Sequence, residues 1–175
     1  MGAEYIAKRQ FDAERYRHYV NEWNSVLHCH HYATLYTQLA DDAGDLFDGL
    51  KILYDTAEES FYPVLKDYFE KHSLNDLDDR IKIVEQYCAF TGLGKMTINS
   101  ASMTEGEVEM SFSHVDSGWI KKWGERDKPV NIITHGYLAA AFAVLHNLPI
   151  GSFIVKEIES IVSGAENSIM KIEKK

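Results

Sequence analysis

Three histidines and a cysteine stand together at His28-Cys29-His30-His31, and imidazole and thiolate are the side chains that bind transition metals most readily. In an extended chain His28 and His30 would share one face, whereas in a helix His28 and His31 would approach each other. Either arrangement supplies two ligands, so a metal site needs a third ligand from a distant residue. The alternative is that these histidines form hydrogen bonds with neighbours or face solvent. We expect Cys29 to be a small buried apolar residue, because no oriented base beside it would make it a nucleophile.

A second group of reactive side chains lies at Ser113, His114 and Asp116. These are the residue types of a catalytic triad, but a triad is formed in space, and residues this close in sequence usually point in different directions. Trp119 and Trp123 follow at a spacing of four, which places both rings on one face of a short helix. They form either part of the core or the wall of a ligand pocket.

The element that must position these side chains is a helix predicted from Pro129 to Asn147, where apolar residues recur every three or four positions. Pro129 suits the first turn of a helix, and Asn147 followed by Pro149 suits a left-handed end. Gly136 leaves room for another backbone or a ligand to approach the helix closely. Two strands, 152–162 and 167–172, are predicted to follow as a hairpin around Gly164.

This C-terminal segment resembles the end of the 4-vinyl reductase domain family, also called the hydrocarbon-binding domain. In that family a helix with a Gly-aromatic step is followed by a strand carrying Glu-x-x-Cys, a turn with glycine and a second cysteine on the last strand. The corresponding residues here are Gly136-Tyr137, Glu157-Ile158-Glu159-Ser160, Gly164 and Ser168. Both cysteine positions are therefore occupied by serine.

The resemblance implies a zinc site that this sequence has altered. Family members hold zinc with the glutamate, the two cysteines and a third cysteine before the helix, which corresponds to about Asn131. Hydroxyl and amide groups are poor zinc ligands beside thiolate or imidazole, so we expect the family's zinc site to be absent. Whether the chain binds another cofactor stays open.

The resemblance also implies an α+β fold, a mostly antiparallel sheet packed against helices, similar to the ligand-binding domain of NO signalling and Golgi transport proteins. In that arrangement the helix lines a ligand cavity. His135, Gly136 and Tyr137 would then contact the ligand, and Trp119 and Trp123 would form part of the cavity wall.

Composition limits the classes of function that remain. The chain has 175 residues, of which 45% are apolar and 12% aromatic, enough for one domain with a sizeable core. Its formal charge of -9 disfavours nucleic acid and anionic membranes as partners. Two cysteines form no disulfide framework, and no apolar run is long enough for a leader or a membrane span, so we expect a cytoplasmic protein.

We predict an N-terminal arm over 1–15 and a single domain over 16–175. Periodicity predicts the remaining elements: an extended hairpin over 16–30, helices over 32–40, 45–72 and 73–92, and strands over 95–101 and 107–113. Pro63 predicts a break in the longest helix between Glu58 and Tyr62, with Ser60 capping the second part. These elements on their own also indicate a helical layer on an antiparallel sheet, an α+β domain.

The leading hypothesis is a stand-alone domain, acting as a homodimer, that binds or senses a small, largely apolar or aromatic molecule. The first alternative is a metal-dependent enzyme that uses His28, His30 or His31. The second is an association subunit without a ligand, as in the related transport-complex subunits. No nucleotide-binding glycine motif or nucleophile-elbow motif occurs, and whether the chain is an enzyme stays open.

Overall fold

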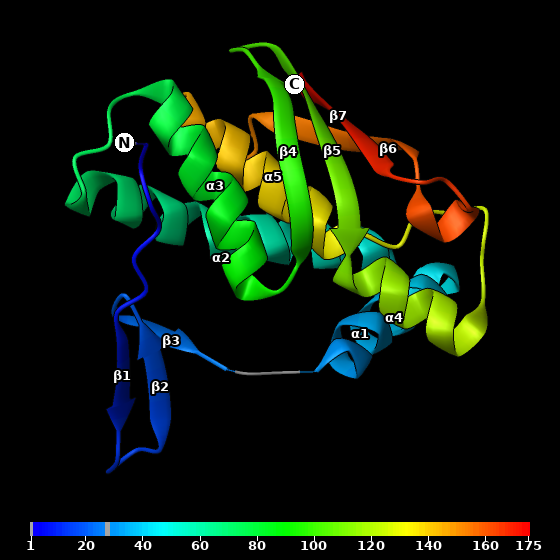
Figure 1. Cartoon of the computed structure of the whole chain (residues 1–175). Helices are drawn as coiled ribbons and strands as arrows, with labels where there is room; N and C mark the ends of the chain where they lie inside the picture. Colours follow the sequence, from blue (N-terminus) through cyan, green and yellow to red (C-terminus); the bar gives the residue numbers. More distant parts are fainter. Residues whose placement is uncertain (1, 27–28) are drawn as a thin grey trace.

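The computed structural model describes residues 2–26 and 29–175, and it has the predicted α+β architecture (Figure 1). Its elements in chain order are β1 (Arg9–Asp12), β2 (Arg17–Val20), β3 (Trp23–Ser25), α1 (His30–Asp42), η1 (Ala43–Asp45), α2 (Gly49–Lys71), α3 (Leu77–Thr91), β4 (Gly94–Ala101), β5 (Glu105–Ser113), α4 (His114–Trp123), α5 (Ile132–Leu145), β6 (Phe153–Glu159), η2 (Ile161–Ser163) and β7 (Ser168–Lys174). None of the helices in these ranges is long and apolar enough to cross a membrane.

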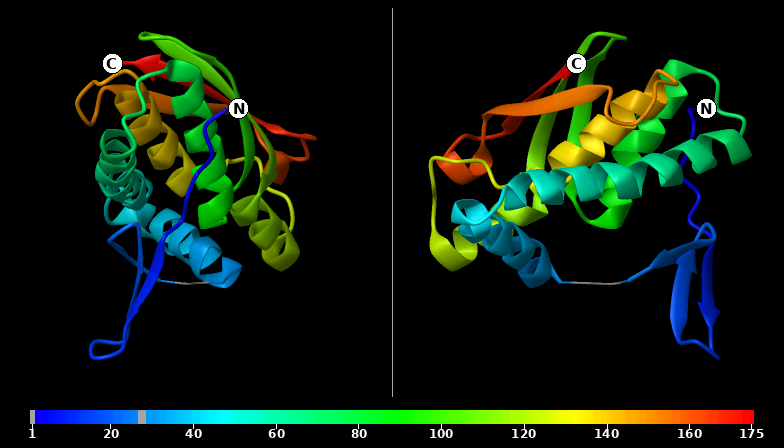
Figure 2. Two further views of the ribbon diagram at one scale, coloured as in Figure 1. Left: turned by 60° about the vertical axis from the view of Figure 1, so that its left-hand side comes forward. Right: turned by 180° about the vertical axis from the view of Figure 1, so that it is seen from behind.

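The main sheet has four antiparallel strands in the order β4-β5-β7-β6. Alternate residues of its strands point to one face, and on β5 and β7 these are the apolar residues Val108, Met110, Met170 and Ile172, all fully buried. Helix α5 packs on this face, and α2 packs on the far side of α5 (Figure 2). The core therefore lies between the sheet and two layers of helix.

Helix α5 is buried on all sides, since every residue from Thr134 to Leu145 is buried. The sequence predicted an apolar stripe on this helix, but a helix that is apolar around its whole circumference belongs in the interior. It begins at Ile132, later than predicted, and it ends as expected before Asn147, whose φ is 55°.

The predicted break at Pro63 is wrong, because α2 is continuous from Gly49 to Lys71. Proline removes one helical hydrogen bond, which leaves the carbonyl of Glu59 without its donor. Glu59 is exposed, so water can satisfy that carbonyl, and packing of α2 along α5 stabilises the helix on both sides of the proline. Ser60 does not cap a new helix and instead donates to the carbonyl of Thr56 at 2.7 Å.

The first strand of the predicted C-terminal hairpin is shorter than expected, and the second continues to Lys174. β6 ends at Glu159, and the chain then forms the short helix η2, which Gly164 ends with a φ of 91°. The helix predicted over 73–92 begins later than expected, at Leu77, because Asp76 caps it by accepting from the backbone N–H of Asp79. It ends as predicted at Gly92, in the left-handed conformation.

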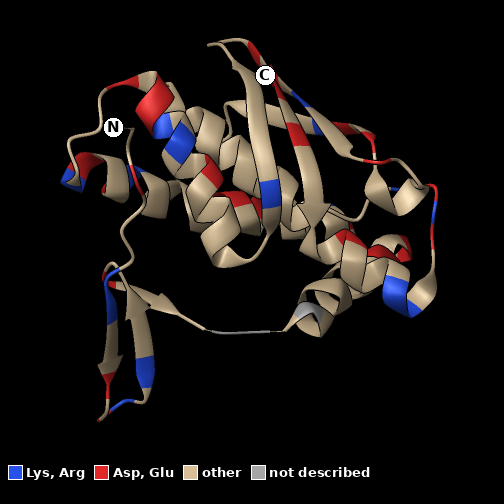
Figure 3. Cartoon of the chain, viewed as in Figure 1, with Lys and Arg blue, Asp and Glu red and all other residues tan. Residues whose placement is uncertain are grey.

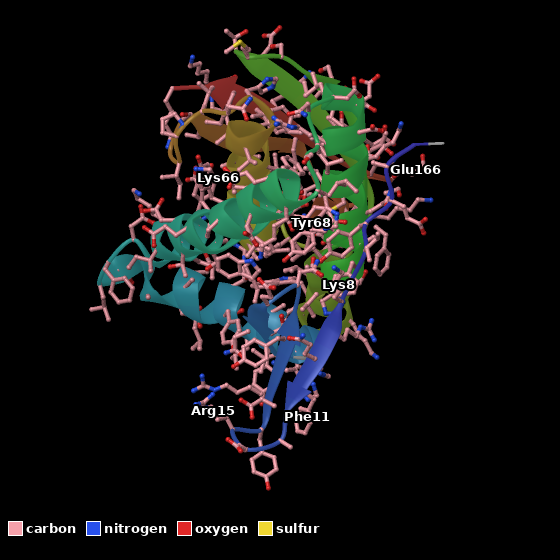
Figure 4. All side chains as sticks on the ribbon, turned by 90° about the vertical axis from the view of Figure 1, so that its left-hand side faces the viewer. Lys8, Phe11, Arg15, Lys66, Tyr68 and Glu166 are labelled. Atoms are coloured by element: carbon pink, nitrogen blue, oxygen red, sulfur yellow. The ribbon has the colours of Figure 1, made fainter. Side chains whose placement is uncertain are left out.

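Strands β1, β2 and β3 form a separate three-stranded antiparallel sheet that projects from the body, with Phe11 and Arg15 far from Tyr68 (Figure 4). Before this sheet the chain is attached to the helices, because the Tyr5 ring lies 4.9 Å from that of Tyr68 between centroids. Trp23 Nε1 also donates to Asp67 on α2 at 3.1 Å. The predicted boundary at residue 15 falls in the turn between the paired strands β1 and β2.

Candidate functional site

A buried network of polar side chains joins the ends of β5, α4, α5 and β6. Ser113 is the last residue of β5 and caps α4, where its Oγ accepts from the backbone N–H of Asp116 at 3.0 Å. The same hydroxyl donates to Asn131 Oδ1 at 2.5 Å. Ser113, Asp116 and Asn131 are all buried. The start of α4 is thus connected to the residue immediately before α5.

Asn131 lies between two carboxylates. Its Nδ2 donates to Asp116 Oδ2 at 2.8 Å and to Glu157 Oε1 at 3.1 Å. One turn further along α5, His135 Nε2 lies 2.8 Å from Glu157 Oε2. The Glu157 side chain has no exposed surface, and that of His135 is 9% exposed. A single amide group therefore separates two buried acids, and one of these acids is also paired with a histidine.

The two acids differ in their protonation. Burial raises the pKa of Asp116 to about 6, and the neighbouring charge of Glu157 acts in the same direction. Burial would also raise the pKa of Glu157, but the hydrogen bond and charge of His135 outweigh it and hold that pKa below its ordinary value. Asp116 Oδ1 has no hydrogen-bond partner within the part of the chain that the structure describes. Glu157 is therefore the charged member of the pair, and Asp116 is the more easily protonated one.

The four positions of the family's zinc site meet at this end of the sheet, but their side chains do not fit zinc. Asn131 directs its amide N–H groups toward Glu157, and Ser168 Oγ accepts from the backbone N–H of Ile161 at 2.9 Å. Ser160 is buried, and its hydroxyl lies near enough to Glu157 to lower the pKa of that acid. The Oγ atom of Ser160 makes no hydrogen bond of good geometry with a described residue. One carboxylate, two hydroxyls and an amide donor are a poor zinc donor set.

The two predicted pocket tryptophans lie together on α4. Their ring centroids are 4.6 Å apart, and the guanidinium of Arg126 lies 4.7 Å from the Trp119 ring. Trp119 is buried in a small second core with Val115, Val130 and Val162, whereas 41% of Trp123 is exposed. This core directly adjoins the polar network, since Asp116 and Asn131 follow Val115 and Val130 in the chain.

Gly136 and Tyr137 lie on different surfaces of α5 from His135. A Cβ atom at Gly136 would lie 2.3 Å from the carbonyl oxygen of Tyr54, so this glycine permits close approach of α2, one of the two occupants that the sequence allowed. Tyr137 is fully buried and its hydroxyl donates to the carbonyl of Val84 on α3 at 2.5 Å. Both residues thus contact helices, whereas His135 contacts β6.

The predicted metal ligands are His28, His30 and His31. His28 lies outside the described residues, and the structure does not describe the side chain of His30. His31 is exposed on α1, with its Nδ1 3.7 Å from Cys29 Sγ. Cys29 is exposed, not buried as expected, because it lies at the start of α1 and outside the core. Over 2–26 and 29–175, no three His, Cys, Asp or Glu side chains form a group that could hold a metal ion.

Two of the hollows on the described surface lie away from the predicted pocket. One of about 660 Å³ lies between α1 and α2, and four of its nine lining residues are acidic, among them Asp41, Asp45 and Asp48. The other, of about 280 Å³, lies at the C-terminal end of α5 beside Val144 and Asn147. The surroundings of Trp119 and His135 are closely packed.

Sequence reasoning missed the part that Asp116 plays. Ser113 and Asp116 do act together, as a helix cap and its partner, and no described hydrogen bond gives them the geometry of a triad. Glu157 and Asn131 were named only as positions that correspond to the family's zinc ligands. No signal in the sequence places Asp116 beside them, because residues 116 and 157 meet only when the sheet and α4 are assembled.

Comparisons with known proteins identify the fold. A scan of protein-family profiles gives no match, and neither does a search of curated proteins. Among solved structures, the chain resembles the phenol-responsive sensory domain of the transcription activator PoxR, solved with phenol, with a TM-score of 0.77 and 14% identity. That match covers 95% of this chain and 84% of the other.

Two further structures share the architecture at greater distance. A vinyl-4-reductase family protein from Methanocaldococcus jannaschii has a TM-score of 0.54 and 15% identity over 86% of this chain and 84% of its own. A trafficking protein particle complex subunit 3 from Naegleria fowleri, covalently bound to palmitic acid, has a TM-score of 0.51 and 11% identity over 83% and 94% of the two chains. The fold expected from the resemblance to the vinyl reductase family is thereby confirmed.

Proposed function

We propose that this chain is a small-molecule-binding or sensing domain whose ligand is small and largely apolar or aromatic. The observation that carries the proposal is the match to the phenol-responsive sensory domain, which extends over 95% of this chain at a TM-score of 0.77. One of the more distant neighbours supports the same class, since the trafficking complex subunit is covalently bound to palmitic acid, an apolar molecule. In this proposal the domain acts as a homodimer in the cytoplasm.

We propose that the ligand binds at the junction of the second core and the polar network. Trp119 and Trp123 offer aromatic surface, and Asp116 Oδ1 offers a buried acceptor that has no donor among the described groups. A molecule with an apolar ring and one hydroxyl would satisfy both features. His135 does not contact the ligand in this proposal. It pairs with Glu157, which accepts from Asn131, and it would influence the ligand through these two residues.

Binding at this junction requires α4 to move, because Trp119 is 5% exposed and packed against Val130 and Val162 in the structure. Gly136 and Tyr137 have no part in this version of the site, since they pack on α2 and α3. Ligand affinity should consequently depend on residues of α4 and little on the opposite surface of α5.

The test is a titration of the purified protein with phenol as the probe, together with mass spectrometry of any molecule that copurifies. Trp119→Ala and Asp116→Asn should each weaken phenol binding about tenfold or more, the loss expected for an aromatic contact or a buried hydrogen bond. Trp23→Ala is the matched control, because Trp23 lies on β3 and contacts α2 instead of α4. Undiminished affinity in a folded Trp119→Ala variant would refute this site, and absence of any bound small molecule would refute the function.

A further inference from the structure

Arg126, in the loop between α4 and α5, connects three other segments of the chain. Its guanidinium lies 4.7 Å from the centre of the Trp119 ring on α4, and its Nη1 donates to Asp41 Oδ2 on α1 at 2.9 Å. Its backbone N–H donates to the carbonyl of Val162 in η2 at 3.0 Å, and its carbonyl accepts from Ser163 Oγ at 2.9 Å. Arg126 therefore holds the loop against α1, α4 and η2.

The guanidinium of Arg126 covers the ring that the proposed ligand would contact. Trp119 is 5% exposed and the Arg126 side chain is 20% exposed, so the guanidinium is the outer of the two groups. A guanidinium over the face of an indole ring is held there by the charge distribution of the ring. An aromatic molecule that stacks on Trp119 needs the same ring face. Arg126 and such a ligand therefore compete for one position.

A second cation on α4 makes the same kind of contact without closing anything. Lys122 Nζ lies 4.2 Å from the centre of the Trp123 ring, but Lys122 is exposed and Trp123 is 41% exposed. Arg126 instead covers a buried ring, and the carboxylate that fixes it belongs to a side chain that is only 26% exposed. A cation–π contact and an ion pair are both stronger when they are shielded from water. The contact of Arg126 can therefore hold a site closed, and that of Lys122 cannot.

The end of α1 offers the guanidinium a second position. Asp41 lines the hollow of about 660 Å³ between α1 and α2, and Lys128 of the Arg126 loop lines it as well. Acidic residues gather at this end of α1, behind α4 in Figure 3, and those that line the hollow are Asp41, Asp42, Asp45 and Asp48. A guanidinium that leaves Trp119 can turn into this hollow and exchange an aromatic ring for carboxylates, with which it forms strong hydrogen bonds. Arg126 thus has a charge partner in two different positions.

We propose that Arg126 is the gate of the ligand site. In the closed position, which the structure shows, it covers Trp119. In the open position it pairs with the acids of the hollow, and the ring of an aromatic ligand takes its place on Trp119. This inference rests on the proposed function, because it takes Trp119 as the aromatic contact of the ligand. A gate that is open in ~10% of the molecules or fewer lowers the apparent affinity about tenfold or more.

The first test measures the association of phenol with the protein by stopped-flow tryptophan fluorescence. Arg126→Ala should bind phenol about tenfold more tightly or better, through faster association, because the ligand no longer displaces a side chain. Arg126→Lys keeps the charge without the flat guanidinium, and its rate should lie between those of the alanine variant and the wild type. Lys122→Ala is the matched control and should bind phenol as the wild type does.

The outcomes separate the gate from the proposed function. If the wild type binds phenol but a folded Arg126→Ala variant binds it no faster, the gate is overturned and the function stands. If neither protein binds phenol, the ligand site and its gate are both overturned.

The second test removes two acids of the hollow and leaves Asp41 in place. The double variant Asp42→Asn, Asp45→Asn should associate with phenol more slowly than the wild type, because the open position of Arg126 loses charge partners. Its effect is opposite in sign to that of Arg126→Ala, which loss of structural support would not produce. Asp78→Asn with Glu105→Gln, at exposed positions on α3 and β5, is the control for the change in net charge. An unchanged or faster rate in the double variant would overturn the gate.

A third measurement needs no ligand. In a Trp23→Phe, Trp123→Phe background the fluorescence comes from Trp119, and its quenching by acrylamide reports how well that ring is covered. Arg126→Ala should increase the quenching at an unchanged circular dichroism spectrum, and Lys122→Ala should leave it as it was. Equal quenching with and without the Arg126 side chain would overturn the gate, because the guanidinium would then not cover Trp119.

Discussion

Replacing Asp116 with asparagine should stabilise the folded protein at neutral pH and remove part of its pH dependence. Burial raises the pKa of Asp116 to about 6, against an ordinary value of 3.8. The folded state therefore binds this proton more tightly than the unfolded state does. The stabilisation that results is fully present below about pH 4 and is lost as the pH rises through 6.

The magnitude follows from the size of the shift. A difference of about two pH units corresponds to about 3 kcal/mol, and this is an upper value for the cost of ionising Asp116 at pH 7 and above. In Asp116→Asn the side-chain carbonyl can still accept from Asn131, while the new amide group takes the place of Oδ1, which has no described donor to lose. We expect the variant to be ~1–3 kcal/mol more stable than the wild type near pH 7.5 and no more stable near pH 4.5.

The assay is urea unfolding of both proteins between about pH 4.5 and 7.5. The difference between the two unfolding free energies isolates Asp116 from other titrating groups such as Glu58, whose pKa burial also raises. Glu157 has the opposite sign, because its lowered pKa gives stability that is lost only as the pH falls below the ordinary range of glutamate. Asp45→Asn, at an exposed position, is the control for removal of one negative charge. A variant that is less stable than the wild type near pH 7.5, or that keeps the wild-type pH dependence, would refute this account of the network.

Two further predictions concern close packing and the altered zinc positions. Gly136→Ala should destabilise the protein by ~1–3 kcal/mol despite a gain of about 1 kcal/mol in helix propensity, because the new Cβ would meet the Tyr54 carbonyl. Gly44→Ala is the control, because its Cβ would meet nothing within 4 Å. That variant should change the unfolding free energy by less than about 0.5 kcal/mol. Equal urea midpoints for these two variants would contradict the close approach of α2 and α5. The triple variant Asn131→Cys, Ser160→Cys, Ser168→Cys should bind one zinc ion per chain by elemental analysis and lose thermal stability with a chelator, and the wild type should do neither. Stoichiometric zinc in the wild type would contradict the predicted loss of the site.

Local signals in the sequence were sufficient for most of the elements. Gly92 marks the end of α3, because a left-handed residue acts within a few positions of itself, whereas the start of that helix lies at Leu77, later than predicted. Pro63 shows where such signals fail. Its effect on the helix is local, but the packing of α2 against α5 is contributed by residues far away in the chain, and that contribution decides the outcome.

The candidate site was only partly accessible from the sequence. His135, Glu157 and Asn131 could be named from the family's spacing, but the link from Asp116 to Asn131 depends on how α4 leaves the sheet. The same limit applies to α1. Its periodicity identifies an apolar surface at Tyr32 and Leu39, but the spacing does not say whether that surface faces the body or the solvent, and here it faces solvent.

The hydrogen bonds of Asn131 determine how the proposed binding site could open, and single hydrogen bonds contribute ~0.5–3 kcal/mol each. The Asn131 amide is the described hydrogen-bonding link between Asp116 on α4 and Glu157 on β6. Movement of α4 away from α5 would break the bond to Asp116 while leaving the bonds from Asn131 and His135 to Glu157 in place. Opening the junction on the α4 side would therefore break few hydrogen bonds, and its larger cost would be the exposure of Trp119 and the valines packed on it, which an aromatic ligand would have to cover again.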